Sequence, residues 1–239
     1  MLIAGWMFSL PVSTLSAEDH QQFGVLLTKY NQAGHVDYAG FKSEETCLDA
    51  YLEGLAMIDP DSLVREERFA FYINAYNAWT IKLILSGYPG VTSIKKLGSL
   101  FKSPWKKKIV RIDGRLTTLD HIEHDILRPE FKDPRIHFAV NCASRGCPPL
   151  YQEPFVGSQL NRQLNEVTRR FINSSEYSRL EGNTLYVSSI FKWFSEDFNE
   201  DIIGFFQKHA SGKLKSDINT RKSSLKIKYL DYDWSLNGS

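Results

Sequence analysis

The segment from Leu63 to Leu85 constrains the fold more than any other part of the sequence. Drawn as a helix it is apolar nearly all round, as the run 69–79 illustrates. A helix without a polar face is stable only when other elements cover it. Asp61 and Ser62 are suitable N-cap residues, and Gly87 follows as a stop signal. The sequence therefore predicts one long buried helix around which the rest of the chain packs.

Two amides interrupt this apolar segment. Asn74 and Asn77 lie on one helical stripe with Glu67 and Ala70. A buried amide needs hydrogen-bond partners, because an unpaired polar group costs about 1–3 kcal/mol. The two side chains can hold loop backbone against the helix, or they can line a substrate-binding pocket. We expect the first role for at least one of them.

Hydrophobic periodicity and turn residues predict the remaining elements. Helices dominate and strands are scattered, which predicts an α+β fold, mainly helical with a small sheet, in a single domain over residues 18–239. An extended link is expected over 35–40 and a loop over 90–105, and Pro129 is expected to end a helix. The expected helices cover 20–32, 43–58, 63–85, 117–128, 159–171, 189–198 and 201–209, and the expected strands cover 106–112, 184–188 and 227–237.

Residues 136–149 carry the densest group of reactive side chains. They contain two of the three cysteines, Cys142 and Cys147, together with a histidine. Whether the run forms a strand or a helix, His137 and Asn141 fall on one face. We therefore expect a polar site built around His137, Asn141 and the two cysteines.

A second histidine pair lies on the helix expected over 117–128. His121 and His124 are three residues apart and can share a face, while Glu123 points elsewhere. With His137 and the two cysteines they offer ligands that zinc accepts, but the spacing matches no standard zinc framework. This hypothesis ranks below those that follow, and we predict no metal or other cofactor.

Composition indicates an ordinary globular protein, with 42% hydrophobic and 24% charged residues and a formal net charge of +1. This balance gives no reason to expect a nucleic-acid partner. The basic run between Lys95 and Arg115 fits a solvated edge better than a polyanion site.

Residues 1–17 are uncharged and apolar and end in small residues, which predicts a signal peptide and an exported, periplasmic protein. If this segment is instead a hydrophobic N-terminal helix, the protein is cytoplasmic. No other stretch approaches the ~20 apolar residues of a membrane span, so no stable membrane anchor is expected after cleavage.

Four separated motifs in order resemble the domain of unknown function family 547: residues 71–78, 119–128, 137–149 and 232–237. The family occurs in bacteria, often as exported proteins, and in plants and animals joined to other domains. The resemblance implies a family and no particular reaction.

One hypothesis for the function is a hydrolase or acyl transferase of the Cys/His type. A thiolate attacks an acyl carbon, a histidine acts as base, and an amide orients the histidine or serves the oxyanion. Arg145 would lower the thiol pKa, and the substrate would be an unidentified small molecule or peptide. The candidates are Cys147 or Cys142 as nucleophile, His137 or His124 as base, and Asn141 or Asn74 as the amide.

The alternative is a non-catalytic periplasmic binding or interaction module. In that case a structural Cys142–Cys147 disulfide holds the loop, and His137 and the asparagines are satisfied polar groups of the core. The small loop predicts a stabilisation of about 2 kcal/mol in the chain-entropy picture.

Overall fold

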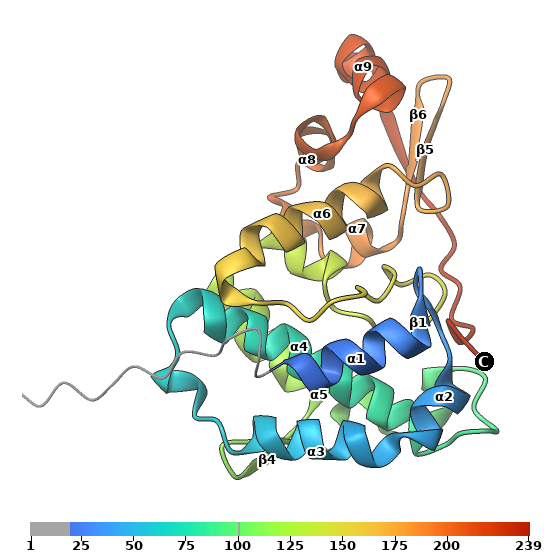
Figure 1. The fold of residues 1–239 in the computed structure, drawn as a ribbon. Helices are drawn as coiled ribbons and strands as arrows, with labels where there is room; N and C mark the ends of the chain where they lie inside the picture. Colours follow the sequence, from blue (N-terminus) through green and yellow to red (C-terminus); the bar gives the residue numbers. More distant parts are fainter. Residues whose placement is uncertain (1–19, 100) are drawn as a thin grey trace, which may run out of the picture.

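The computed structural model of the chain describes residues 20–99 and 101–239, and the predicted signal peptide lies outside them (Figure 1). Over these residues helices dominate, and the strands form three small sheets, so the predicted mainly helical α+β fold is confirmed. Within the same part of the chain, no helix combines the length and the apolar character that crossing a bilayer requires.

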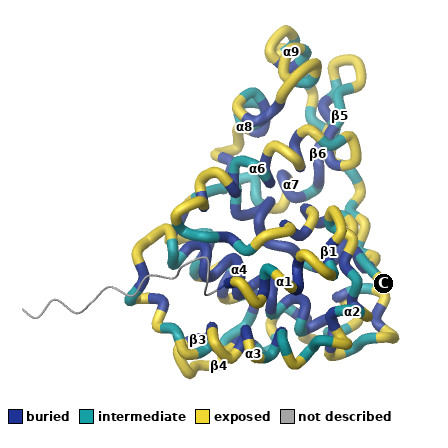
Figure 2. The backbone as a smooth tube through the Cα atoms, in the orientation of Figure 1, coloured by how far each residue is buried: buried dark blue, intermediate teal, exposed yellow. Residues whose placement is uncertain are grey.

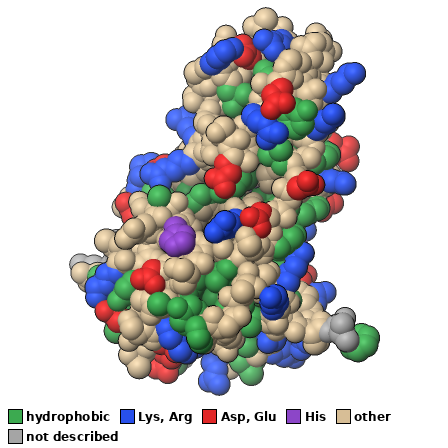
Figure 3. All heavy atoms as spheres, turned by 90° about the vertical axis from the view of Figure 1, so that its right-hand side faces the viewer, with side chains coloured by type: hydrophobic (Ala, Val, Ile, Leu, Met, Phe, Trp, Pro, Cys, Tyr) green, Lys and Arg blue, Asp and Glu red, His purple; other side chains and the backbone are tan. Residues whose placement is uncertain are grey.

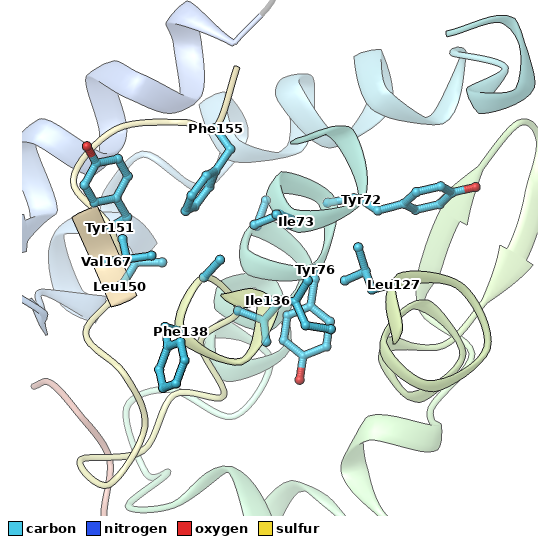
Figure 4. Close-up of a cluster of buried hydrophobic side chains, with 14 of the residues drawn as sticks. Tyr72, Ile73, Tyr76, Leu127, Ile136, Phe138, Leu150, Tyr151, Phe155 and Val167 are labelled. Atoms are coloured by element: carbon cyan, nitrogen blue, oxygen red, sulfur yellow. The ribbon is translucent and has the colours of Figure 1, made fainter. Parts of the chain in front are cut away.

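The long helix α4 (Arg65–Leu85) is the central element, as predicted, and most of its residues are buried (Figure 2). Helix α1 (Gln21–Tyr30) packs on α3 (Glu45–Ala56), and α3 packs on α4. In Figure 4, Ile73 and Tyr76 of α4 belong to the same cluster of buried side chains as Ile136, from the segment that carries the site. The helix therefore supports the backbone on which the candidate site is built.

The prediction of an extended link over residues 35–40 is wrong. Strand β1 (Asn31–Gln32) pairs with β2 (His35–Val36) in a small hairpin, and helix α2 (Tyr38–Ser43) begins directly after it. The cause is a cap, because the Asp37 carboxylate accepts a hydrogen bond of 2.8 Å from the Gly40 N–H in the first turn.

The expected helix end at Pro129 is also wrong. A hairpin of β3 (Val110–Ile112) and β4 (Arg115–Thr117) leads into α5 (Leu119–His121), which continues as a π-helix over Ile122–Phe131. In an α-helix the proline ring clashes with the carbonyl four residues earlier, whereas π-helical bonds go to the fifth. The helix thus passes Pro129 and ends at the left-handed Lys132 (φ 52°).

The second half of the chain packs above the first in Figure 1. Strand β7 lies parallel to β6, which pairs antiparallel with β5. Helix α9 was not predicted, and the strand expected over 227–237 is confined to β7. The bounds are α6 (Leu160–Ile172), β5 (Ser178–Glu181), β6 (Thr184–Val187), α7 (Ile190–Trp193), α8 (Ile202–His209), α9 (Gly212–Arg221) and β7 (Lys226–Tyr229).

After β7 the C-terminal tail, residues 230–239, returns to the first half of the molecule (Figure 1). The Val36 N–H donates to the Asn237 carbonyl at 3.1 Å, and the Tyr38 N–H donates to the Ser239 carbonyl at 2.8 Å. The C-terminal end is therefore bonded to β2 and to the first residue of α2, and buried side chains of both halves form one connected core. On the face drawn in Figure 3, Lys and Arg side chains are interspersed with Asp and Glu.

Candidate active site

The segment predicted to carry the site is neither a strand nor a long helix. It begins as a short 3-10 helix, Pro134–Phe138, and then runs without regular structure to the loop of the two cysteines. Irregular buried backbone leaves its N–H and C=O groups without ladder partners, so other groups must satisfy them.

Asn77 of α4 supplies two of these partners. Its Nδ2 donates to the Ala139 carbonyl at 2.9 Å, and its Oδ1 accepts from the Asn141 N–H at 2.8 Å. Asn74 clamps a second segment in the same way, with bonds of 2.7 and 2.8 Å to the carbonyl and N–H of Phe155. Both amides thus take the backbone-holding role that was expected for at least one of them.

Asn141 shapes the turn that presents the first cysteine. Its Oδ1 accepts from the Ala143 N–H at 2.9 Å, and its Nδ2 donates to the Pro148 carbonyl at 2.8 Å. Ala143 adopts a left-handed conformation (φ 59°), which is uncommon for a residue with a Cβ. Asn141 therefore holds a backbone conformation that the chain would not otherwise favour.

The Cys142 thiol lies in a small network of hydrogen-bonding groups. Its Sγ is 3.1 Å from Ser144 Oγ and 3.1 Å from Tyr232 OH, and Ser144 donates to Tyr232 at 3.0 Å. Each hydroxyl has one proton, so this bond leaves the Tyr232 proton free to point at the sulfur. Cys147 lies on the other side, and its Sγ accepts from the Cys142 N–H at 2.9 Å. Both cysteines, and Cys47, are free thiols in this structure.

The surroundings shift the pKa values of the two thiols in opposite directions. The hydrogen bond from the Cys147 thiol, together with the one from the Tyr232 hydroxyl, lowers the pKa of Cys142 from 9.0 against the opposing effect of burial. Burial, and then the hydrogen bond to Cys142, raise the pKa of Cys147 well above its ordinary value. Burial raises the pKa of Tyr232, which therefore keeps its proton. Cys142 is accordingly the thiol that ionises first.

The C-terminal tail brings Tyr232 to this position. The Arg145 N–H donates to the Ser235 carbonyl and the Gly146 N–H to the Asp233 carbonyl, both at 2.9 Å. A Cβ at Gly146 would lie 3.0 Å from the Tyr232 ring and 3.0 Å from the Asp233 nitrogen. Glycine at 146 therefore permits the close approach that places the tyrosine hydroxyl on the thiol.

Both thiols open onto a pocket of about 210 Å³. Three of the chain's five tryptophans line it, together with the histidines at 124 and 137. Cys142 is half-buried and Cys147 is buried. The lining comes from widely separated segments, namely α4, the loop before β3, the helix of residues 119–131, the cysteine loop, α7 and the tail.

His137 joins the wall of this pocket to a carboxylate. Its Nε2 lies 2.6 Å from Asp197 Oδ2, its side chain is 1% exposed, and its ring stacks on Phe194 with centroids 4.0 Å apart. Arg128 Nε binds the same carboxylate at 2.6 Å. Burial alone would raise the pKa of Asp197, but the hydrogen bonds from His137 and Arg128 lower it to about 2. The carboxylate therefore stays charged and fixes the imidazole.

The helix that carries His124 is oriented differently from the prediction. His121 is exposed and binds Asp125, whereas Glu123 and His124 both line the pocket. Glu123, expected to point elsewhere, accepts a hydrogen bond of 2.9 Å from the buried Tyr76 hydroxyl. The physical reason is the π-helical winding, which rotates the residues relative to the α-helical spacing assumed for the sequence.

The remaining predicted residues lie apart from the pocket wall. Arg145 is exposed and borders a separate hollow with Tyr177 and Asp231, while Asn74, Asn77 and Asn141 act on backbone behind the wall. Among residues 20–99 and 101–239, no group of three or more His, Cys, Asp or Glu side chains is arranged to hold a metal ion.

Sequence reasoning missed several groups that touch the thiol and the imidazole. Tyr232 and Asp197 are 90 and 60 residues from the side chains they contact. Ser144 was not among the candidate residues, although it lies two residues after Cys142. For the tyrosine a signal was present, because it belongs to a tail motif that resembled the same family as the cysteine loop.

Residues 60–172 match the family model described as "Protein of unknown function, DUF547". This segment contains α4, the helix of residues 119–131, the cysteine loop and α6. No curated protein and no solved structure matches the chain.

Proposed function

Because the chain belongs to the DUF547 family, whose function is unknown, we infer its function from the pocket. We propose that it is a thiol enzyme that transfers or hydrolyses acyl groups through Cys142. The observation that carries this proposal is the Cys142 sulfur at the pocket wall, with Tyr232 and Ser144 hydroxyls at 3.1 Å. A thiol held by donors ionises at lower pH and becomes a nucleophile.

The His137–Asp197 pair supplies the proton chemistry that such a reaction needs. In the first step the Cys142 thiolate forms a bond to the acyl carbon, the leaving group departs, and protonated His137 gives it a proton. In the second step water attacks the thioester, His137 takes the proton of the water, and the thiolate is released. Asp197 holds the imidazole at 2.6 Å and stabilises its charged form.

Of the two candidate histidines, His137 suits this role better. Its partner is a carboxylate, whereas His124 Nδ1 faces the Arg128 guanidinium at 3.2 Å. A carboxylate accepts the imidazole N–H and so orients the ring, whereas a guanidinium has no acceptor to offer. Cys142 is likewise favoured over Cys147, because the Cys147 pKa is raised.

The proposal is tested with p-nitrophenyl acetate, a small activated ester, in a Cys47→Ser background. We expect a burst of nitrophenol, an acetyl group on Cys142 located by mass spectrometry, and loss of both in Cys142→Ala. Replacing His137 by Gln is expected to slow turnover by roughly 10²–10⁴-fold. A protein that is never acylated at Cys142 contradicts the proposal.

The competing proposal remains a non-catalytic module with a Cys142–Cys147 disulfide. The pocket in front of Cys142 and the Tyr232 hydroxyl 3.1 Å from its sulfur support the enzyme instead. Purification without reductant from an exporting host, followed by alkylation and mass spectrometry, separates the two. A stoichiometric disulfide that no cellular reductant opens would favour the module. The same preparation shows whether residues 1–17 are removed, as the export proposal requires.

A further inference from the structure

We propose that the pocket next to Cys142 recognises a substituted ammonium group, so that the substrate is a small acyl compound with a cationic head. The inference rests on the proposed acyl-transfer function and names its substrate class. It depends on two features of the lining, an aromatic wall and a pair of carboxylates.

The aromatic wall is built from four rings in contact. Tyr232 and Trp234 have centroids 4.5 Å apart, Trp193 lies 4.7 Å from Tyr232, and Trp105 meets Trp234 edge-on at 6.0 Å. Aromatic faces attract cations through their quadrupole, most strongly for tryptophan, and recognise quaternary ammonium ligands in this way. Trp234 already does so here, because the exposed Lys95 ammonium lies 3.5 Å from the centre of its ring.

The charges of the lining have the sign that a cation requires. Among the described residues, the wall includes the carboxylates of Asp120 and Glu123 but no lysine or arginine. Lys106 reaches Asp120 only at 3.8 Å, and Glu123 is held in place by the Tyr76 hydroxyl. The Arg128 guanidinium is engaged by Asp197 and Glu196 behind the wall. Ionisation of Cys142 adds a further negative charge to the same pocket.

An anionic substrate would meet these carboxylates, no lysine or arginine among the described lining residues offsets them, and the His137 imidazolium of the reaction is already paired with Asp197. An apolar substrate would leave the carboxylates desolvated and unpaired, which is costly. A pocket of about 210 Å³ is small, which favours a compact head group over a large ligand. A small ammonium compound satisfies the rings, the carboxylates and the volume together.

Binding of the head group is measured first, on Cys142→Ser, so that no chemistry is needed. Choline and tetramethylammonium are titrated by calorimetry and tryptophan fluorescence against 3,3-dimethyl-1-butanol, the neutral isostere of choline. We expect the ammonium probes to bind at least about tenfold more tightly than the isostere, since a desolvated cation–π contact and a nearby carboxylate each contribute. Equal binding of the isostere, or no binding of either cation, would overturn the inference.

Variants of the lining then locate the site. Glu123→Gln keeps an oxygen for the Tyr76 hydroxyl and removes the charge. Asp120→Asn removes the charge of the second carboxylate. Each is expected to weaken choline binding several-fold. Glu53→Gln, an exposed residue of α3, is the matched control and should change nothing. Choline binding that is unaffected in both pocket variants would also count against the proposal.

A second readout uses the thiol itself. Cys142 is modified with methanethiosulfonates that carry a trimethylammonium or a sulfonate group, in the Cys47→Ser background. Each rate is divided by the rate of the same reagent with 2-mercaptoethanol. We expect the normalised preference for the cationic reagent to be about tenfold and to fall in Glu123→Gln. A normalised ratio of one or below would contradict a cation site.

The two proposals fail in different ways. A Cys142 that reacts with neither reagent and is never acylated removes the thiol enzyme, while the choline titration still decides whether the pocket binds ammonium. A reactive Cys142 without choline binding keeps the enzyme and removes this substrate class.

Discussion

At the scale of single residues, the chemistry of the site depends on the tyrosine that the tail brings to the thiol. The Tyr232 hydroxyl donates to the Cys142 sulfur and stabilises the thiolate more than the thiol, because hydrogen bonds to charged groups are the stronger ones. Tyr232→Phe removes this donor and leaves the ring in the aromatic wall. We expect the Cys142 pKa to rise by about one unit, since a bond to a charged group contributes about 1.5–3 kcal/mol.

The measurement is the rate of Cys142 alkylation against pH in the Cys47→Ser background. Tyr229→Phe is the matched control, because this tyrosine is 41% exposed and lies on β7. An unchanged titration curve in Tyr232→Phe would mean that the tyrosine packs against the sulfur without stabilising its charge.

At the scale of elements, α4 determines the shape of the irregular segment. Asn77→Ala would leave the Ala139 carbonyl and the Asn141 N–H buried without their partner. Each such group costs about 1–3 kcal/mol, so we expect the free energy of unfolding to fall by about 2–4 kcal/mol. Chemical denaturation measures it. Asn219→Ala on the exposed side of α9 is the control, with an expected change within about 0.5 kcal/mol.

The elements also show which parts of the fold could be predicted from the sequence and which could not. The all-round apolar character of residues 63–85 predicted α4 nearly to its ends, because a buried helix is built mostly from apolar residues. No comparable sequence pattern distinguished the π-helix at 122–131 from an α-helix, so Glu123 was assigned to the wrong face. Asp197 and Tyr232 meet the site across 60 and 90 residues, a separation that no local periodicity specifies.

At the scale of the whole molecule, the half-buried Asp197 and the buried His209 make stability depend on pH in two separate ranges. Asp197 has its pKa lowered to about 2, so its contribution is complete above its ordinary pKa near 4 and is lost as the pH falls towards 2. His209 of α8 acts in a separate window. Burial, and then the cations of Lys208, Arg135 and Arg169, lower its pKa from 6.5 to about 4.

Because the unfolded His209 takes up a proton at about pH 6.5 and the folded one only near pH 4, acid favours unfolding between these values. The side chain is 4% exposed, and none of the described residues bonds its Nε2. Between pH 6.5 and pH 4, the free energy of unfolding of His209→Phe is therefore expected to fall by about 2–3 kcal/mol less than that of the unmodified protein. At pH 8 we expect the protonation of His209 to contribute little. Denaturation at closely spaced pH values measures this, with the exposed His35→Phe as the control. A His209→Phe curve parallel to that of the unmodified protein would show that this histidine is protonated in the folded state as readily as in the unfolded one.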